Sequence, residues 1–585
     1  MIVLALLACG PDATAPATGQ LAFGLPLVND GQLYAGVARV DITPSITETF
    51  DDLDGDYYFD GCPTDPTASR SSCLEPFDDA NGNGRFDAVW MGGWGGGGRA
   101  ARGVHDAIYA TALVLALDGE YLALVSLDAV GLLEYRTTRM RQRLDEAGFA
   151  ADRVVVANTH THQGPDTVGL WGNLDELITG LDPEYQASLE DAVHDAVYAA
   201  ATTAVPVAPT QGAVNLVNLD PAYSGAPFGG TNPDDRMLGL VRDGRDPILV
   251  DDQVLTLALD GANGRLATVV SYSAHPEVVG YENDLIGADY VGVTRALIED
   301  DAGGTAMFLP SAVGGMQSAH GGTLPAVDEA GAPVYDDAGE RVFITGDGYE
   351  YARVAGTLVA QAALAAPVDD TPWDTLSVRS TAVMLPLTNL GFQVALRTDV
   401  LDQPWDSLVT SNECPGMGTD PEVIACVSTG VWHLQLGPIS LGTVPGELLP
   451  ELFYGVPAEP GMESAAARST DPRFPHHPAA CDDADWSTCR EQETDGDCAC
   501  EDMHAAPYVL SYDEAMPALA DTLPGPYRAV IGLANGYIGY AIPEPDYSSI
   551  ANAITGIEGN HSEEWYSGGS RMAPAIQDGW LALEP

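Results

Sequence analysis

The chain has 585 residues, with 85 acidic residues against 24 basic ones and a formal net charge of −61. A surface this negative repels phosphate backbones and anionic bilayers, which argues against a nucleic-acid-binding protein and favours divalent cations as partners. Compositional bias with a salt-adapted surface would explain the same charge. Because 45% of the residues are hydrophobic and only 19% are charged, we expect a large folded core and not wholesale disorder.

The N-terminal segment is apolar and ends in Leu6-Leu7-Ala8-Cys9, which is typical of a bacterial lipobox with Cys9 as the lipidated residue. It is short and lacks a basic n-region, so a misplaced start or a degraded signal are alternatives. Residues 11–19 are interpreted as a flexible tether. We therefore expect a lipoprotein-type signal and tether over residues 1–19. The protein is expected to be extracytoplasmic, either secreted or anchored to a bacterial membrane only through Cys9.

Eight further cysteines fall in local groups, which predicts disulfides and hence an oxidising compartment. The groups are Cys62 with Cys73, Cys414 with Cys426, and Cys481 with Cys489, Cys498 and Cys500. A zinc knuckle in the last group is the alternative, but its spacings lack the paired C-x2-C pattern of structural zinc sites. The pairing does not follow from the sequence.

Residues 34–44 alternate apolar and polar side chains and end at Pro44, which predicts a first strand and its exit turn. From residue 121 strands and helices alternate, which is typical of α/β architecture. The predicted strands lie at 121–127, 153–157, 266–273 and 306–309, and the helices at 133–147, 183–203, 288–299 and 349–366. Shorter strands are expected near residues 376–387, 431–436, 439–444 and 529–533. We predict an α/β fold with mixed central sheets flanked by helices. One domain is expected over residues 20–585, with an acidic insertion at 50–90 and a Cys-rich insertion at about 411–505.

The acidic insertion contains two segments with oxygen-bearing side chains at alternate positions around a Gly, as calcium loops have. The first has Asp52, Asp54, Asp56 and Asp60, and the second has Asp79, Asn81, Asn83 and Asp87. Neither has the bidentate Glu at position 12 of a full EF-hand. We predict weak or shared calcium binding, with a merely solvated acidic loop as the alternative. The Gly-rich stretch at 92–98 is interpreted as a flexible loop near the functional site.

Four polar motifs each follow a predicted strand, where ligands usually collect in an open α/β sheet. The first motif contains His160-Thr161-His162 and the second contains His275. The third is Pro445-Gly446-Glu447, and the fourth runs from Asn535 to Tyr540. Two His at i and i+2 on an extended segment face one side, where they bind one metal or divide the roles of ligand and proton donor. Two His, a Glu and a Tyr would form a nitrogen and oxygen shell suited to Zn²⁺. A hydrogen-bonded structural role is the alternative, above all for His275.

These motifs, in this order, resemble the catalytic domain of the neutral/alkaline ceramidase family from about residue 34 to the C-terminus. The matching segments are 35–44, 103–106, 158–165, 444–447 and 532–540. The family hydrolyses the amide bond of ceramide with one zinc. The resemblance implies that the zinc ligands are His160, His275, Glu447 and Tyr540. It implies that His162 and Tyr566 stabilise the oxyanion or pass a proton to the leaving amine.

The chain departs from the family at two places that touch substrate. Asn218-Leu219-Asp220-Pro221 stands where the family has an Arg that reaches the active site, and Met316-Gln317-Ser318 falls in a segment that contacts substrate. The immunoglobulin-like module that usually follows is not expected. Because substrate choice lies in the walls of the pocket, ceramide as the substrate does not follow from the metal motifs.

We therefore expect a zinc-dependent amidohydrolase acting on a ceramide-like lipid. The alternatives are a calcium-dependent surface lipoprotein that has lost catalysis, and a metal-dependent esterase or amidase with other substrates. The chain has no Gly-x-Ser-x-Gly motif, which removes the main support for a serine esterase. His105-Asp106 either supports the ligands of the site or starts a helix over residues 107–115, and we favour the structural role.

Overall fold

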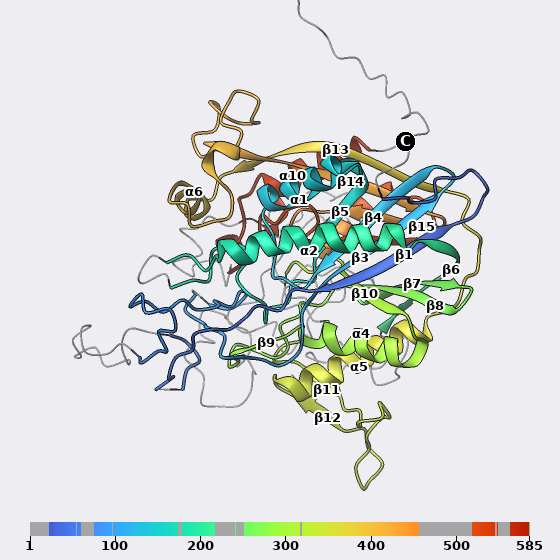
Figure 1. Ribbon diagram of the computed structural model, residues 1–585, viewed down its shortest axis with the longest axis horizontal. Helices are drawn as coiled ribbons and strands as arrows, with labels where there is room; N and C mark the ends of the chain where they lie inside the picture. Colours follow the sequence, from blue (N-terminus) through green and yellow to red (C-terminus); the bar gives the residue numbers. More distant parts are fainter. Residues whose placement is uncertain are drawn as a thin grey trace, which may run out of the picture.

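The computed structural model describes residues 23–53, 55–59, 75–95, 97–173, 178–216, 240–241, 251–315, 319–455, 518–544, 547 and 562–583. Within these residues the predicted α/β class with mixed sheets flanked by helices is confirmed (Figure 1). The signal and tether, Leu219, Gln317 and most of the Cys-rich insertion lie outside the described residues. None of the described helices combines the length and apolarity needed to cross a membrane.

An eight-stranded mixed sheet forms the centre of the molecule, in the order β10-β8-β7-β6-β1-β3-β4-β5. Its strands are β1 (Tyr34–Asp41), β3 (Tyr109–Leu117), β4 (Glu120–Leu127), β5 (Val154–Asn158), β6 (Val205–Asn215), β7 (Gln253–Gly261), β8 (Gly264–Tyr272) and β10 (Thr305–Pro310). Only β4 with β5 and β8 with β10 pair in parallel. The carboxyl ends of β5 and β8 lead directly into the loops that carry His160 and His275.

A second sheet packs face to face on the first and has the order β13-β14-β15-β17. Its strands are β13 (Leu376–Leu387), β14 (Ala425–Leu436), β15 (Ile439–Thr443) and β17 (Tyr527–Ile531). Leu113 and Leu124 of the large sheet meet Trp432 and Leu441 of the small one in a shared core. Beyond β15 and β17, the short strands β16 (Glu447–Leu448) and β18 (Tyr540–Ala541) pair in parallel, with Glu447 opposite Tyr540.

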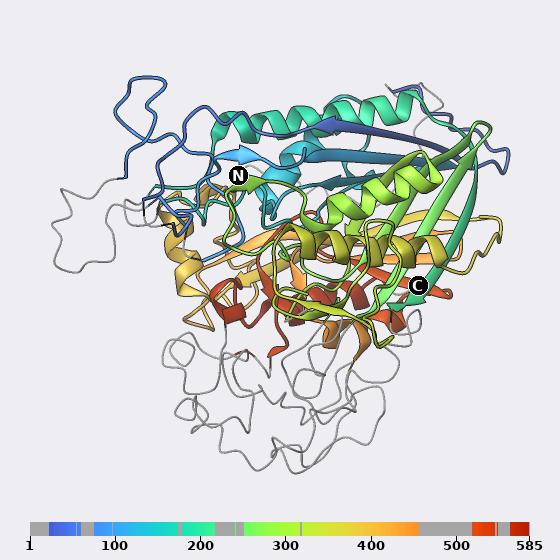
Figure 2. The same cartoon turned by 90° about the horizontal axis from the view of Figure 1, so that it is seen from below.

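Helices cover the outer faces of both sheets, so the layers run helix, sheet, sheet, helix (Figures 1 and 2). The large sheet is covered by α2 (Pro183–Thr202), α4 (Asp289–Ala302) and α5 (Tyr349–Ala365), and the small sheet by α10 (Met572–Leu581). Helix α2 begins where the Asp182 carboxylate accepts hydrogen bonds from two backbone N–H groups and Pro183 occupies the first turn. The remaining elements are α1 (Glu134–Glu146), α6 (Leu390–Arg397), α7 (Pro450–Tyr454), α9 (Ser562–Trp565), β2 (Gly103–Val104), β9 (Leu285–Ile286), β11 (Thr323–Pro325) and β12 (Phe343–Thr345).

The helix considered over residues 107–115 is wrong, because most of that segment is strand β3. The strand is buried on both sides, with Leu113 and Leu115 facing the second sheet and Ala112 and Val114 facing α2. A strand buried on both faces reads as a continuous apolar run, which the period of the sequence does not separate from a buried helix.

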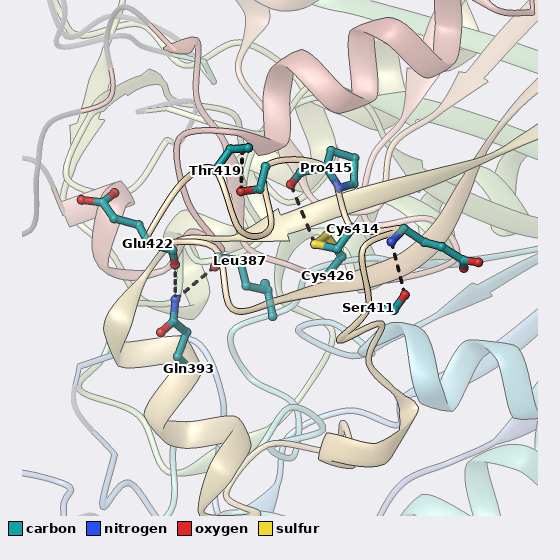
Figure 3. The surroundings of a disulfide bond; sticks show 10 residues. Leu387, Gln393, Ser411, Cys414, Pro415, Thr419, Glu422 and Cys426 are labelled. Carbon is teal, nitrogen blue, oxygen red and sulfur yellow. Dashed lines mark hydrogen bonds between the residues drawn. A yellow bond between two sulfur atoms is a disulfide. The ribbon is translucent and has the colours of Figure 1, made fainter.

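One predicted disulfide group lies within the described residues. Cys414 and Cys426 are joined with a Cα–Cα distance of 5.6 Å, which ties the loop after residue 410 to the first residues of β14 (Figure 3). Gln393 of α6 donates to the carbonyls of Leu387 and Glu422 beside it. The other cysteines fall outside the described residues.

Candidate metal centre

Four loops meet at the carboxyl ends of β5, β8, β15 and β17, and backbone hydrogen bonds fasten them to one another. The His162 N–H donates to the Pro276 carbonyl at 2.9 Å, which joins the two His loops. The Glu447 N–H donates to the Gly539 carbonyl at 3.0 Å, which joins the Glu and Tyr loops. The Asn158 N–H donates to the Leu533 carbonyl, which joins these two pairs, so segments far apart in sequence are held as one constellation.

The side chains of His160, His162, His275 and Glu447 converge inside this constellation. Glu447 Oε2 lies 3.0 Å from His275 Nε2 and 3.4 Å from His160 Nε2. His162 Nε2 lies 3.4 Å from His160 Nε2, and ligand atoms of the three His all lie within 4.8 Å of one another. All four residues are at most 7% exposed. This is a buried cluster of nitrogen and oxygen donors around a single point.

Hydrogen bonding around His160 shows that the cluster fits a cation. The Val130 carbonyl can only accept, so His160 Nδ1, which contacts it, carries the hydrogen and Nε2 carries a lone pair. That lone pair faces the Glu447 carboxylate, another acceptor. Facing acceptors in a buried space repel each other unless a proton or a metal ion lies between them, so the donor set suits a divalent metal.

The electrostatics of the cluster favour an ionised Glu447 and a neutral His162. Burial alone would raise the pKa of the Glu447 carboxyl, but the charges and hydrogen bonds that His160 and His275 supply when they are protonated outweigh it and hold the pKa well below its usual range. Burial, together with the neighbouring His160 and His275, lowers the pKa of His162 well below its ordinary value. Neutral imidazole and ionised carboxylate are the forms in which these side chains bind metals.

The two predicted tyrosines lie at different depths. Tyr540 Oη is 3.5 Å from His275 Nε2, at the edge of the cluster, and burial raises the pKa of its phenol well above the ordinary value. As a phenolate ligand it would therefore need the metal's charge beside it. Tyr566 lies farther out, where its hydroxyl donates to the Gly95 carbonyl at 3.2 Å. The geometry permits two fourth ligands beside His160, His275 and Glu447, namely Tyr540 and His162.

Strained backbone gathers at this cluster. His160, Leu533 and Asn535 have φ values of 70°, 49° and 59°, in the left-handed region that side chains other than Gly seldom adopt. The Leu533 carbonyl accepts from the Asn158 N–H, and the Leu533 N–H donates to the Gly446 carbonyl. Such outliers persist only where the surroundings impose them, and they concentrate at functional sites.

Sequence reasoning missed several residues that surround His162. Glu277 Oε2 lies 3.5 Å from His162 Nδ1, and the Trp94 ring meets the imidazole edge to face at 5.4 Å. The Arg99 guanidinium is fully buried and donates to the carbonyls of Gly92 and His162, and burial lowers its pKa to about 10. The sequence offers one signal for these contacts, which is the proximity of Trp94 and Arg99 to the Gly-rich stretch.

The Gly-rich stretch itself lies at the site, as expected. Gly93 has a φ of 100°, and a Cβ there would stand 2.3 Å from Cγ of His162. Only Gly therefore allows the backbone to approach the imidazole this closely.

His105 and Asp106 occupy a separate cleft of about 340 Å³ between α4, α5 and the start of β3. His105 stacks on Tyr349 at 3.8 Å, and Asp106 accepts from the Ala288 N–H at the start of α4. The Tyr349 hydroxyl donates to Asn283, which in turn donates to Gln163 of the His loop. The pair therefore does not start a helix over residues 107–115, and Asp106 instead accepts a hydrogen bond at the start of α4.

The predicted calcium loop is exposed and satisfies its own backbone. Asp79 accepts from the N–H groups of Asn83 and Gly84, and the Asn81 and Asn83 amides donate to Asp87 at 2.6 and 2.7 Å. The buried Glu48 carboxylate accepts from the N–H groups of Ala80 and Asp87 at both ends of the loop. Its four predicted ligands are thus gathered, but each is already engaged in hydrogen bonds. Asp54 and Asp60 of the first predicted loop lie outside the described residues.

Comparison with known proteins supports the resemblance predicted from the motifs. Residues 79–340 match the family model of the N-terminal domain of neutral/alkaline non-lysosomal ceramidase. Two solved structures share the fold. The first is a neutral ceramidase from Pseudomonas aeruginosa, which is 14% identical with a TM-score of 0.50, and the match covers 95% of this chain and 75% of that one. The second is a ceramidase complexed with C2, which is 14% identical with a TM-score of 0.51, and the match covers 94% of this chain and 75% of that one. No curated protein sequence matches significantly. The resemblance to the neutral/alkaline ceramidases is therefore confirmed, and the solved structures show a common fold.

Proposed function

We propose that this chain, similar to neutral/alkaline ceramidases over residues 79–340, is a zinc-dependent amidohydrolase acting on a ceramide-like lipid. The observation that carries the proposal is the buried convergence of His160, His275 and Glu447. The Nε2 atoms of the two His lie 3.4 and 3.0 Å from Glu447 Oε2. The ligands proposed are these three side chains and Tyr540. A zinc ion held there would lower the pKa of a water molecule to about 7 and so supply a nucleophile at neutral pH.

His162 is proposed to move protons in this reaction. Its Nδ1 faces the Glu277 carboxylate at 3.5 Å, which favours a hydrogen on Nδ1 and leaves a lone pair on Nε2 toward the cluster. A neutral imidazole in this orientation accepts a proton at Nε2 and returns it to the departing amine nitrogen. The lowered pKa of His162 keeps the ring neutral before the reaction begins.

Tyr566 is proposed to donate a hydrogen bond to the developing oxyanion. Burial raises the pKa of its phenol, so the hydroxyl stays protonated and remains a donor. Its position against Gly95 of the Gly-rich loop places it in the outer part of the site.

Metal content and amide hydrolysis test this proposal together. We expect about one zinc per chain, hydrolysis of a short-chain fluorogenic ceramide, loss of activity with a chelator and recovery on adding zinc. Parallel assays with an ester and a polar amide of matched chain length distinguish a ceramide-like substrate from the metal-dependent esterase or amidase alternative. Full activity in metal-free protein would contradict the mechanism. Bound zinc without hydrolysis of any of the three substrates would favour a binding protein that has lost catalysis.

We also propose an extracytoplasmic location and a weak calcium site at Asp79, Asn81, Asn83 and Asp87. The Cys414–Cys426 disulfide supports an oxidising compartment, because such bonds persist mainly outside the cytosol. The net charge of −61 supports recruitment of divalent cations. Labelling with palmitate and a Cys9→Ala variant would test the proposed lipid anchor.

A further inference from the structure

A second tyrosine, Tyr537, contacts the metal cluster through Glu447. Its hydroxyl donates to Glu447 Oε1 at 2.9 Å, and the residue is only 3% exposed. The other carboxylate oxygen, Oε2, is the one that faces His160 and His275. The two oxygens of Glu447 therefore have separate partners, a phenol on one side and the cluster on the other.

The surroundings leave the Tyr537 side chain little freedom. A Cβ on Gly131 would stand 2.6 Å from Cγ of the ring, so the ring lies directly against that backbone. The neighbouring Val130 carbonyl fixes the tautomer of His160, as described above. Backbone bonds from Ile538 to Pro445 and from Glu447 to Gly539 fasten the Tyr537 loop to the Glu447 loop on both sides of the contact. The hydroxyl is thus aimed at Oε1 by its own loop and by the segment that orients His160.

A carboxylate binds a metal through one oxygen or through both, and the choice changes the coordination number. A hydrogen bond to the oxygen that is not used fixes the orientation of the ligand and commonly strengthens metal binding. The phenol is a suitable donor here because an ionised carboxylate can only accept, and the Tyr537 hydroxyl lies 2.9 Å from Oε1. Tyr537 therefore differs in role from Tyr540, although the two are three residues apart.

We propose that Tyr537 is a positioning residue that presents Glu447 to the metal through Oε2 alone. The inference rests on the proposed metal-dependent function and adds to it how the carboxylate is held. It predicts that Glu447 is a monodentate ligand and that one coordination position is kept open for water or substrate.

The test is the affinity of the apoprotein for zinc, measured by competition with a chromophoric chelator, in Tyr537→Phe. We expect zinc affinity to fall about 10- to 100-fold, the usual cost of removing a hydrogen-bond partner of a metal ligand. With Co²⁺ in place of zinc, we expect the visible spectrum to shift toward a higher coordination number as the freed Oε1 reaches the metal. Tyr185→Phe is the matched control, because this partly buried phenol of α2 donates to the Ile42 carbonyl at a distance from the cluster. It should bind zinc like the unmodified protein and give its cobalt spectrum.

Zinc affinity and a cobalt spectrum unchanged in Tyr537→Phe would overturn the inference. If that variant does not fold, a crystal structure of the unmodified protein with zinc decides the question. Zinc at about 2.0–2.2 Å from Oε2, with Oε1 still on the Tyr537 phenol, supports the inference, whereas zinc bound by both oxygens overturns it. Failure of the unmodified protein to bind zinc would instead refute the proposed function, so the two failures are distinguishable.

Discussion

The His and Glu cluster and the exposed loop at Asp79 to Asp87 both gather ligand-type side chains, but they differ in what those side chains already contact. At the cluster, His160 Nε2 faces the Glu447 carboxylate in a buried space. The neutral ring has its hydrogen on Nδ1, so Nε2 has none to donate to the carboxylate. In the loop, Asp79 and Asp87 accept hydrogen bonds from nearby N–H groups and side-chain amides. A buried imidazole lone pair that faces a carboxylate indicates a cation far more strongly than acidic composition does.

The largest expected effect follows from His160→Ala, which removes a buried ligand from the cluster. We expect loss of bound zinc and a fall in kcat/KM of at least about 10³-fold, because metal stabilisation of charge contributes several kcal/mol. Metal analysis and the fluorogenic ceramide assay measure the two effects. His194→Ala on α2, outside the cluster, should change neither. Retained zinc in His160→Ala would remove the contrast with the acidic loop.

A pair of variants sharpens the assignment of roles within the cluster. His162→Gln should retain zinc and lose about 10²- to 10⁴-fold in kcat, the range for general acid–base catalysis. Tyr540→Phe should instead weaken zinc binding, because Tyr540 is the proposed fourth ligand. Chelator competition and steady-state kinetics separate these outcomes. Loss of zinc in His162→Gln with zinc retained in Tyr540→Phe would show that the three His form the ligand set with Glu447.

The buried carboxyl of Asp289 extends the contrast between buried and exposed acids to stability. Burial raises its pKa to about 7 although it accepts from the Val279 and Tyr290 N–H groups. The folded state then binds one proton more than the unfolded state between pH of about 4 and about 7, so stability falls by about 1.4 kcal/mol per unit as pH rises through that window. Asp289→Asn should remove this slope in urea unfolding at pH 5 and 7. Asp300→Asn, exposed on the same helix, should keep the slope, and an unchanged slope in Asp289→Asn would refute the assignment.

The smallest effect is expected at the acidic loop. With calcium at ten times a Kd of about 10⁻³ M, binding would stabilise the protein by about 1.4 kcal/mol. We therefore expect calcium to raise the Tm of the unmodified protein by about one degree and to leave that of an Asp79→Asn/Asp87→Asn double variant unchanged. Amide hydrolysis should be the same in both proteins. An equal response to calcium in both would show that the loop is only solvated.

Local sequence was a good guide to the elements that end at the site. The strands before His160 and His275 were predicted close to their observed bounds, because each is a short apolar run followed by a polar motif. The antiparallel strands β6 and β7 were not predicted, and β3 was open to a helical interpretation. Gly and Pro interrupt β6 at Pro206, Pro209 and Gly212, and such residues ordinarily argue against a strand interior.

The site residues also divide into those that local sequence predicted and those that it did not. His160, His275 and Glu447 were identified because each lies in its own motif, and the structure brings them together. Glu277, Arg99 and Tyr537 were missed as partners because a polar residue in a loop gives no signal of which distant group it meets. Tyr537 and Tyr540 in particular are indistinguishable by residue type, and only their positions relative to Glu447 separate them.

By itself the sequence determined the donor types, their order along the chain and their placement after strands, because these depend on local pattern. Tertiary structure decided the tautomer of His160, the oxygen of Glu447 that faces the cluster and the phenol that holds the other oxygen. These choices are made by partners separated in sequence by 30, 172 and 90 residues respectively. Such partners meet only when the two sheets pack and their strand ends share one edge, so no local pattern encodes them.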